Sequence, residues 1–330
     1  MTNISIVICA YTEKRWEDLN AALDSVLKQT MSPSEIIIVI DHNPALFKRA
    51  TQAFAHLSTN LHIVENVNTR GLSGARNTGI AVSTGSVIAF IDEDAMAAPD
   101  WLARISAAYV DPQIMAIGGS IAPQWLTGKP AWFPDEFNWV VGCTYRGMPE
   151  VRASIRNLIG CNMSIRRSVF DAVGGFRSGI GRVGTLPVGC EETELCIRAR
   201  QQLPEYTIIY DPVIQVYNHR VPGTRANWRY FWSRCFAEGI SKALVSQYVG
   251  QRDSLASEMR YTLKTLPNGV LRGLQDTLRG DLSGLGRSFA ILSGLTLTVS
   301  GFGVGLVSVL FKATSINTDI NTDTVTKQTA

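Results

Sequence analysis

The first third of the chain alternates short apolar runs with longer segments in which apolar residues recur at helical spacing. Apolar runs of this length are typical of strands buried on both faces, and strands that alternate with helices form parallel sheets. The pattern therefore predicts an α/β fold, with a Rossmann-like, mostly parallel sheet flanked by helices. The predicted strands are 4–10, 35–40, 61–64 and 86–91, and the predicted helices are 16–29 and 72–82.

Polar residues directly follow several of these predicted strands. Tyr11, Asp41 and Asp92 each stand at the point where an apolar run ends. Ligands of open parallel sheets bind beyond the carboxyl ends of the strands. We therefore expect these three side chains to lie at one binding site.

The tripeptide Asp92-Glu93-Asp94 carries the strongest chemical signal in this region. Carboxylates at positions i and i+2 point to the same side of a strand end, where they can hold a hard divalent cation. Such a cation usually keeps phosphate oxygens among its ligands, which favours binding of a diphosphate. The alternative is a solvated loop after a strand.

The pattern is looser between Trp101 and Arg225, where we predict a helix over 101–109 and a strand over 115–121. The segment 123–139 is rich in Trp and Pro, and long loops of this kind are often functional, so it is either an acceptor lid or a packed cover over the sheet. Glu191, Glu192 and Glu194 begin a predicted helix. Carboxylates at that position either complement the helix dipole or take part in chemistry.

Composition excludes several classes of protein. A formal net charge of +3 with 18% charged residues, and no block of like charges, argues against a nucleic-acid-binding protein. The six cysteines show no spacing typical of a zinc site, so we expect reduced thiols in a cytosolic domain. The N-terminus has no basic segment before its apolar run, and we therefore expect no signal peptide.

The composition changes again near the C-terminus. Residues 289–311 contain no charged residue, and as a helix they would extend about 34 Å, enough to cross the hydrocarbon core of a bilayer. We predict a single transmembrane helix there, with a re-entrant or interfacial hairpin as the alternative because of its many Gly, Ser and Thr residues. We expect a disordered tail over 312–330.

Basic residues are more frequent before this segment than after it, so the large domain is expected on the cytoplasmic side of the membrane. The stretch 255–285 combines apolar residues with arginines and is predicted either to lie on anionic headgroups or to present a solvated basic face.

Five sequence blocks over residues 1 to about 240 resemble family 2 inverting glycosyltransferases, in the same order. The resemblance implies a glycosyltransferase-A fold, a UDP- or GDP-sugar donor and a divalent metal, Mn²⁺ or Mg²⁺. It also implies a nucleotide-sugar-binding half (1–120), an acceptor-binding half (121–225) and a helical membrane-proximal region (226–288). The blocks are Ala10-Tyr11 with Asp41, then 71–80, 92–94, 174–176 and 191–198.

The resemblance also implies roles for individual residues. Glu192 stands where the family usually has an aspartate that serves as general base, with Glu191 as the fallback, and the longer side chain moves the carboxylate outward. The expected metal ligands are Asp92, Asp94 and His219. The expected nucleotide-binding residues are Ala10, Tyr11, Glu13, Asp41, Arg76, Asp92 and Glu93, and the expected acceptor-binding residues are Asn162 and Trp132.

The sequence as a whole predicts a membrane-bound enzyme that moves one sugar to a lipid-linked, polyprenyl-phosphate-type glycan acceptor. Segment 190–196 and the residues after His219 are similar to glucuronosyltransferases that act on glycosylated dolichyl phosphate. The Gln-x-x-Arg-Trp motif of processive members is absent, which favours transfer of a single sugar.

Other functions stay open at this stage. One is a glycosyltransferase with a soluble or cell-wall acceptor, and another is a non-catalytic membrane protein that binds nucleotide sugar. A nucleotide-dependent oxidoreductase would need GxGxxG after the first strand, where Ala10-Tyr11-Thr12-Glu13 stands instead. The aromatic and basic stretch 227–234 either packs on the core as an amphipathic helix or stacks on a sugar.

Overall fold

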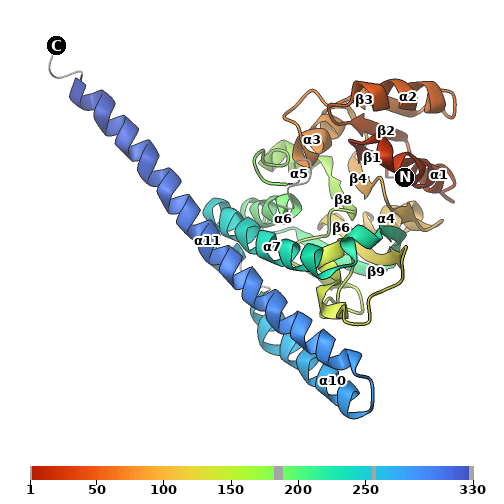
Figure 1. The fold of residues 1–330 in the computed structure, drawn as a ribbon. Helices are drawn as coiled ribbons and strands as arrows, with labels where there is room; N and C mark the ends of the chain where they lie inside the picture. Colours follow the sequence, from red (N-terminus) through yellow and green to blue (C-terminus); the bar gives the residue numbers. More distant parts are fainter. Residues whose placement is uncertain (1, 182–188, 255–257, 327–330) are drawn as a thin grey trace.

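The protein is built around one mixed sheet (Figure 1). The structure is a computed structural model that describes residues 2–181, 189–254 and 258–326. Within these residues the strands pair in the order β3-β2-β1-β4-β8-β6-β9-β5, and β7 pairs with β9. The strands are β1 (Ile4–Ala10), β2 (Glu35–Ile40), β3 (Leu61–Glu65), β4 (Val87–Asp92), β5 (Met96–Ala97), β6 (Ile114–Trp125), β7 (Ala153–Ser154), β8 (Asn162–Arg166) and β9 (Thr207–Val221).

The first four strands form the parallel half of the sheet, and this confirms the predicted α/β architecture. In the register of β1, Ala10 pairs with Ile40 of β2, and Cys9 pairs with Asp92 of β4. Three strands therefore end at the same level, and the residues that follow them meet at one edge of the sheet.

The second half of the chain makes the sheet mixed. Strand β8 is antiparallel to β4 on one side and to β6 on the other, whereas β6 and β9 are parallel. Because β8 lies between β4 and β6, the two predicted halves of the catalytic domain share one continuous sheet. The domain boundaries proposed from the sequence stay predictions.

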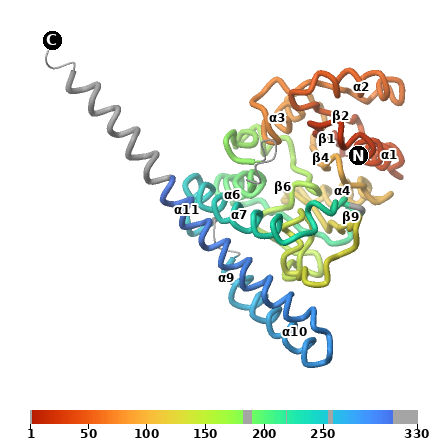
Figure 2. The backbone as a smooth tube through the Cα atoms, viewed as in Figure 1, coloured from red at the N-terminus to blue at the C-terminus, as the bar shows by residue number. Residues whose placement is uncertain are grey.

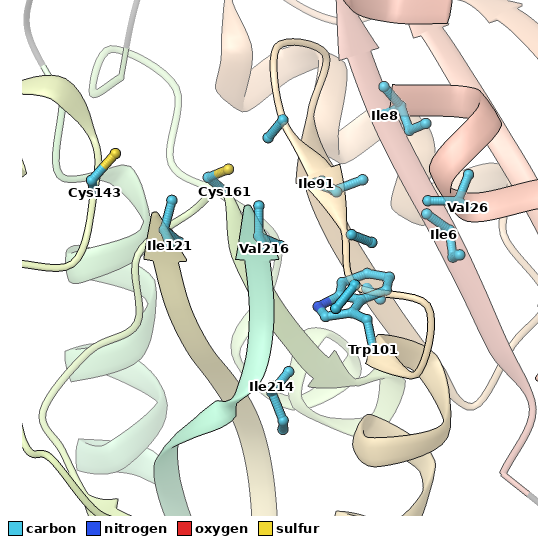
Figure 3. Packing of buried hydrophobic residues seen from close by; sticks show 14 of the residues in the cluster. Ile6, Ile8, Val26, Ile91, Trp101, Ile121, Cys143, Cys161, Ile214 and Val216 are labelled. Carbon is cyan, nitrogen blue, oxygen red and sulfur yellow. The ribbon is translucent and has the colours of Figure 1, made fainter. Parts of the chain in front are cut away.

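Helices cover both faces of the sheet. Alternate residues of β1 point to opposite faces of the sheet, and each face has its own hydrophobic cluster. Ile4, Ile6 and Ile8 belong to the first cluster, with residues of α1, α2 and α4. Val7 belongs to the second cluster, with residues of α3, α5 and α6. Figure 3 shows part of the first cluster, including Trp101, Ile91 and Val216. The helices are α1 (Trp16–Leu27), α2 (Pro44–Phe54), α3 (Leu72–Val82), α4 (Trp101–Ala108), α5 (Arg167–Val173) and α6 (Glu191–Gln202), with short 3-10 segments η1 (Glu13–Arg15), η2 (Asp135–Val141) and η3 (Gly223–Arg225).

Most predicted elements in this domain are confirmed, with shifts at their ends. Helix α3 has the predicted bounds, and α1 ends two residues before the predicted Gln29. Strand β6 continues to Trp125, so the Trp/Pro-rich segment is shorter as a loop than predicted and contains η2. Helix α2 is a further element, which begins after an Asn43 cap with proline in its first turn.

The C-terminal region is helical. Helix α11 runs beside α10 and then along α7 (Figures 1 and 2). The tail predicted over 312–330 includes the end of α11. Its last four residues, 327–330, lie outside the described residues. The elements are α7 (Trp228–Val249), α8 (Gln251–Ser254), α9 (Glu258–Arg260), the π-helical η4 (Tyr261–Thr265), α10 (Leu266–Leu278) and α11 (Ser283–Thr326).

Glycines let α7 and α11 approach closely. A Cβ on Gly301 would lie 2.0 Å from the carbonyl oxygen of Phe236, and one on Gly239 would lie 2.0 Å from that of Thr298. A Cβ on Gly305 would likewise lie 2.6 Å from Ala243 Cβ. The backbones of these two helices are therefore in direct contact.

One face of α11 is apolar and exposed. Within the described residues, Ser283–Ser308 is long and apolar enough to cross a membrane. The exposed large apolar residues recur about every turn or two, at Leu285, Phe289, Leu292, Val299 and Val307. The opposite face carries the glycines that contact α7 and α10, together with larger side chains such as Ile291, which is 1% exposed. Packing therefore uses this face of the helix and leaves the other outward.

Candidate active site

A cavity of about 1070 Å³ extends from the ends of the parallel strands to the C-terminal helices. We call its two parts the sheet end and the helical end. The sheet end is lined by Tyr11, Arg15, Asp41, Arg76, Asp92, Glu93, Asp94, Glu191, Glu192, His219 and Arg225. The helical end is lined by Arg156, Arg234, Glu238, Lys242, Glu258 and Arg260, and by Leu295, Thr298, Val299 and Phe302 of α11.

Asp41 joins the end of β2 to the start of α3. Its carboxylate accepts hydrogen bonds from the Gly71 amide (2.9 Å) and from the Asn66 side chain (2.6 Å). Gly71 has a φ of 122°, which suits glycine and lets its amide point back toward the strand. Asp41 therefore organises this wall of the cavity, and its predicted contact with a nucleoside stays a prediction.

Tyr11 offers an exposed aromatic ring at the sheet end. Its side chain is 40% exposed, and the Arg15 guanidinium lies 5.6 Å from the ring centre. Ala10 also lines the cavity. Glu13 lies in η1 with its side chain exposed and is absent from the described lining, so the structure does not bring it to the other predicted nucleotide-binding residues.

Arg76 links the two acidic groups of the site. It lies on α3 and is 2% exposed, and its guanidinium donates to Glu191 Oε1 (2.8 Å) and lies 3.5 Å from Asp92 Oδ1. The Gly160 carbonyl accepts a further hydrogen bond from it (3.2 Å). Burial works to lower the pKa of Arg76, but Glu191 and Asp92 outweigh it, so the guanidinium stays charged. The strand-end acid and the helix-start acids therefore face one shared space.

The Asp92-Glu93-Asp94 turn has two arginine partners: Glu93 and Asp94 lie at Arg15, whereas Asp92 lies near Arg76. Glu93 pairs with Arg15 (2.6 Å), and Asp94 lies 3.1 Å from the same guanidinium. Burial raises the pKa of Glu93 to about 7, against the attraction of Arg15 and with further raising by the charge of Asp94. Asp92 keeps a side chain that is 30% exposed, and it is the carboxylate of the three that is most open to the cavity.

Asp92, Cys161 and His219 form a cluster with metal-binding potential. One ligand atom of each lies within 4.8 Å of the others. His219 Nδ1 also lies 3.5 Å from Asp94 Oδ1, so the three predicted metal ligands are neighbours. Two carboxylates and an imidazole are donors that fit a divalent ion such as Mn²⁺. The Cys161 thiol is a softer donor, and burial raises its pKa well above the usual value, so it does not add a ligand for such an ion.

Cys161 is a site residue that sequence reasoning missed. It was expected to be a buried core thiol, and it is indeed buried, but it also lies 3.6 Å from His219 Nδ1. Strand pairing places it there: Asn162 pairs with Ile91, so the residue before Asn162 lies opposite Asp92. No motif in the sequence carries this antiparallel register.

Glu191 and Glu192 begin α6 and differ in environment. Glu191 is 4% exposed and is ion-paired with Arg76, whereas Glu192 is partly exposed on the cavity wall. Burial and the adjacent charge of Glu191 raise the pKa of Glu192 to about 8. A carboxylate with such a pKa is a stronger base than an ordinary one at neutral pH. Glu194 is instead held in ion pairs with Arg177 and Arg198.

The two predicted acceptor-binding residues lie in packed surroundings, outside the described lining of the cavity. Asn162 is 1% exposed and donates to the backbone carbonyls of Ser120 and Ile214. Trp132 stacks on Trp228 with ring centres 3.8 Å apart. Their acceptor role stays a prediction.

The helical end contains a second group of charged side chains. Glu258 accepts from Arg156 (2.7 and 3.1 Å) and from Lys242 (2.5 Å). Glu238 pairs with Lys242 (3.5 Å) and Arg234 (3.4 Å) on the same helix. Burial alone would raise the pKa of Glu258, but Lys242 and Arg156 outweigh it and lower the pKa to about 2. These residues come from α7, α9 and the loop before β8.

Comparisons with known proteins identify the family of the chain. The model of the family described as Glycosyl transferase family 2 matches residues 5–174. The chain is 38% identical over 244 residues to the glucosyl-dolichyl phosphate glucuronosyltransferase of Haloferax volcanii. This alignment covers 73% of this chain and 77% of that protein.

Two solved structures share the fold. One is the mannosyltransferase PcManGT of Pyrobaculum calidifontis in complex with GDP-Man and Mn²⁺, with a TM-score of 0.59 and 16% identity over 91% of this chain and 87% of that one. The other is GalNAc-T7 with UDP, GalNAc and Mn²⁺, with a TM-score of 0.52 and 16% identity over 73% of this chain and 48% of that one. The chain therefore belongs to glycosyl transferase family 2, and it is a glycosyltransferase with a glycosyltransferase-A fold.

Proposed function

We propose that this protein transfers a single sugar from a nucleotide-sugar donor to a hydroxyl of a lipid-linked, polyprenyl-phosphate-type acceptor, with inversion at the anomeric carbon. The observation that carries the proposal is Arg76, whose guanidinium contacts Glu191 through one terminal nitrogen (2.8 Å) and Asp92 through the other (3.5 Å). The nucleoside diphosphate leaves next to Asp92, and the acceptor hydroxyl is activated next to Glu191, by the neighbouring Glu192.

Glu192 is the proposed general base. Its carboxylate takes the proton of the acceptor hydroxyl while the hydroxyl oxygen attacks the anomeric carbon. The bond from that carbon to the diphosphate breaks, and its electron pair stays on the phosphate oxygen. Attack from the far side of the sugar inverts the anomeric centre, so no covalent sugar-enzyme bond is needed.

The leaving diphosphate carries negative charge that must be stabilised. Asp92, with Asp94 and His219 beside it, would hold a divalent ion such as Mn²⁺ or Mg²⁺, which would supply Lewis-acid stabilisation when bound. Arg76 adds a fixed positive charge on the same side. Tyr11 offers its exposed ring to the nucleoside base, with Asp41 behind it.

The residues that line the cavity support a lipid-linked acceptor. Leu295, Thr298 and Phe302 belong to the one helix of the described chain that could span a membrane, and they line the same cavity as Glu192. The relative from Haloferax volcanii acts, by its name, on a glucosyl-dolichyl phosphate. The excess of basic residues before α11 supports a cytoplasmic catalytic domain.

Full-length protein in membranes, incubated with a panel of labelled UDP- and GDP-sugars, tests the proposal. We expect one donor to label a lipid-extractable product in the presence of Mn²⁺ or Mg²⁺, and we expect chelator to stop the reaction. Asp92→Asn should lower transfer at least about hundredfold, because it removes a carboxylate from the proposed ion. Asp100→Asn is the matched control, since Asp100 pairs with Arg104 on the surface.

Two results would contradict the proposal. Full activity in chelator would remove the metal role of Asp92. Label that appears only in a soluble or cell-wall product would instead assign the other acceptor class.

A further inference from the structure

The helical end of the cavity has a charge balance opposite to that of the sheet end. Around the sheet end, three arginines face six carboxylates, a deficit of three positive charges that a divalent cation can reduce. Around the helical end, four cations face two carboxylates, an excess of two. The cations of the helical end are Arg156, Arg234, Lys242 and Arg260, and its carboxylates are Glu238 and Glu258.

Three of these four cations lie in partly enclosed surroundings, whereas Arg260 is exposed. The side chains of Arg156 and Lys242 are 11% and 19% exposed. Charges removed from water in this way are costly unless opposite charge balances them. Glu258 is shared by Arg156 and Lys242, and Glu238 is shared by Lys242 and Arg234, so two carboxylates serve three enclosed cations. One further anion would therefore improve the charge balance of the cluster.

The position of the cluster restricts what that anion can be. Glu238 Oε1 lies 3.3 Å from the sulfur of Cys190, the residue directly before Glu191 and Glu192, so the cluster adjoins the proposed base. Thr298, Val299 and Phe302 of α11 line the same cavity, and α11 contacts α7, the helix that carries Glu238 and Lys242, at Gly239 and Thr298. The cationic cluster therefore adjoins both the proposed base and the helix that could cross a membrane.

We propose that Lys242 and Arg156 bind the phosphate that joins the acceptor sugar to its lipid. The acceptor sugar then lies at Glu192, its phosphate lies at the cationic cluster, and its hydrocarbon chain leaves along α11. This inference rests on the proposed function, since it names the part of the acceptor that the cavity holds. It is a binding role: Lys242 and Arg156 take no part in the proton transfer.

Three acceptors distinguish the sources of the anion: a polyprenyl-phosphate-linked sugar, an uncharged alkyl glycoside of the same sugar, and a soluble sugar phosphate without lipid. Lys242→Gln and Arg156→Gln should each lower kcat/KM for the lipid-phosphate acceptor by roughly 10- to 100-fold, as expected for loss of a charged hydrogen bond. They should lower it far less for the alkyl glycoside. Wild type should prefer the lipid-bearing phosphate to the soluble one.

Two further variants keep the test independent of folding. Lys242→Arg retains the charge and should restore most of the selectivity for phosphate. Arg229→Gln removes a cation from the exposed face of α7, outside the described lining of the cavity, and should leave the selectivity of wild type.

The results that overturn the inference differ from those that overturn the proposed function. Equal losses on the phosphorylated and uncharged acceptors would show that Lys242 and Arg156 only support the fold. Losses that appear with a uronic-acid donor but not with the matching neutral-sugar donor would assign the cluster to the donor's carboxylate. If wild type transfers to neither lipid acceptor but does transfer to a soluble one, the proposed function itself fails.

Discussion

The two ends of the cavity differ in how they are built. The sheet end is assembled at the tips of three parallel strands, where neighbouring strand ends bring Asp41 and Asp92 together within a short stretch of sequence. The helical end draws Arg156, Lys242 and Glu258 from three separate elements that meet only in the folded chain. One end is acidic and suits a cation, and the other is basic and suits an anion. A chain can thus hold a donor and an acceptor in one cavity by giving each end its own charge.

Removal of the base between the two ends should have the largest effect. Glu192→Gln keeps the shape of the side chain but cannot accept the proton, and we expect transfer to fall about 10²- to 10⁴-fold. Donor binding, measured by titration calorimetry, should remain. Glu205→Gln, an exposed change after α6, is the matched control. An active Glu192→Gln enzyme would pass the role to Glu191 or to another group.

The same variant should be more stable than wild type at neutral pH. The folded chain raises the pKa of Glu192 from 4.5 to about 8, so the folded state retains a proton that the unfolded state has lost. Between these two pH values, the contribution of this carboxyl to stability falls as pH rises. Glutamine removes that penalty, and Tm at pH 7 to 8 should rise.

The pH dependence of transfer should come from the sheet end. The pKa values of Glu93 and Glu192 are raised to about 7 and about 8, whereas that of Glu258 is held at about 2. Because the base must be deprotonated, kcat/KM should rise up to about tenfold per pH unit below pH 8 and level off above it. A profile that is flat from pH 6 to 9 would exclude Glu192 as a base with this pKa.

The smallest effect should come from a substitution that disturbs the contact between α7 and α11. It should change acceptor binding at the helical end more than donor binding at the sheet end. A Cβ on Gly301 meets the Phe236 carbonyl, so Gly301→Ala should push the helices apart and cost about 1 to 3 kcal/mol in stability. The KM for acceptor should rise more than the KM for donor. Gly303→Ala is the control, since a Cβ there meets nothing within 4 Å. Equal effects of the two variants would argue against this packing.

The sequence predicts the sheet end well because its information is local. An apolar run marks each parallel strand, and the residue that ends it, such as Asp92, is brought to the edge by the parallel register. Arg76 follows from a motif at the start of a helix, but its role as a bridge to Glu191 depends on packing between residues 115 positions apart. Cys161 depends on an antiparallel register, and the cluster around Lys242 depends on how helices pack, which no short pattern encodes.

The part that α11 plays in the cavity bears on which shortened forms of the protein are useful. A soluble fragment that stops near residue 285 would look like a complete globular enzyme by its sheet, yet it would lack Leu295, Thr298 and Phe302. Its reaction chamber would stand open on one side, and water could reach the donor freely. Such a fragment is expected to hydrolyse nucleotide sugar while failing to glycosylate its acceptor, because the apolar helix is also a piece of the chamber wall.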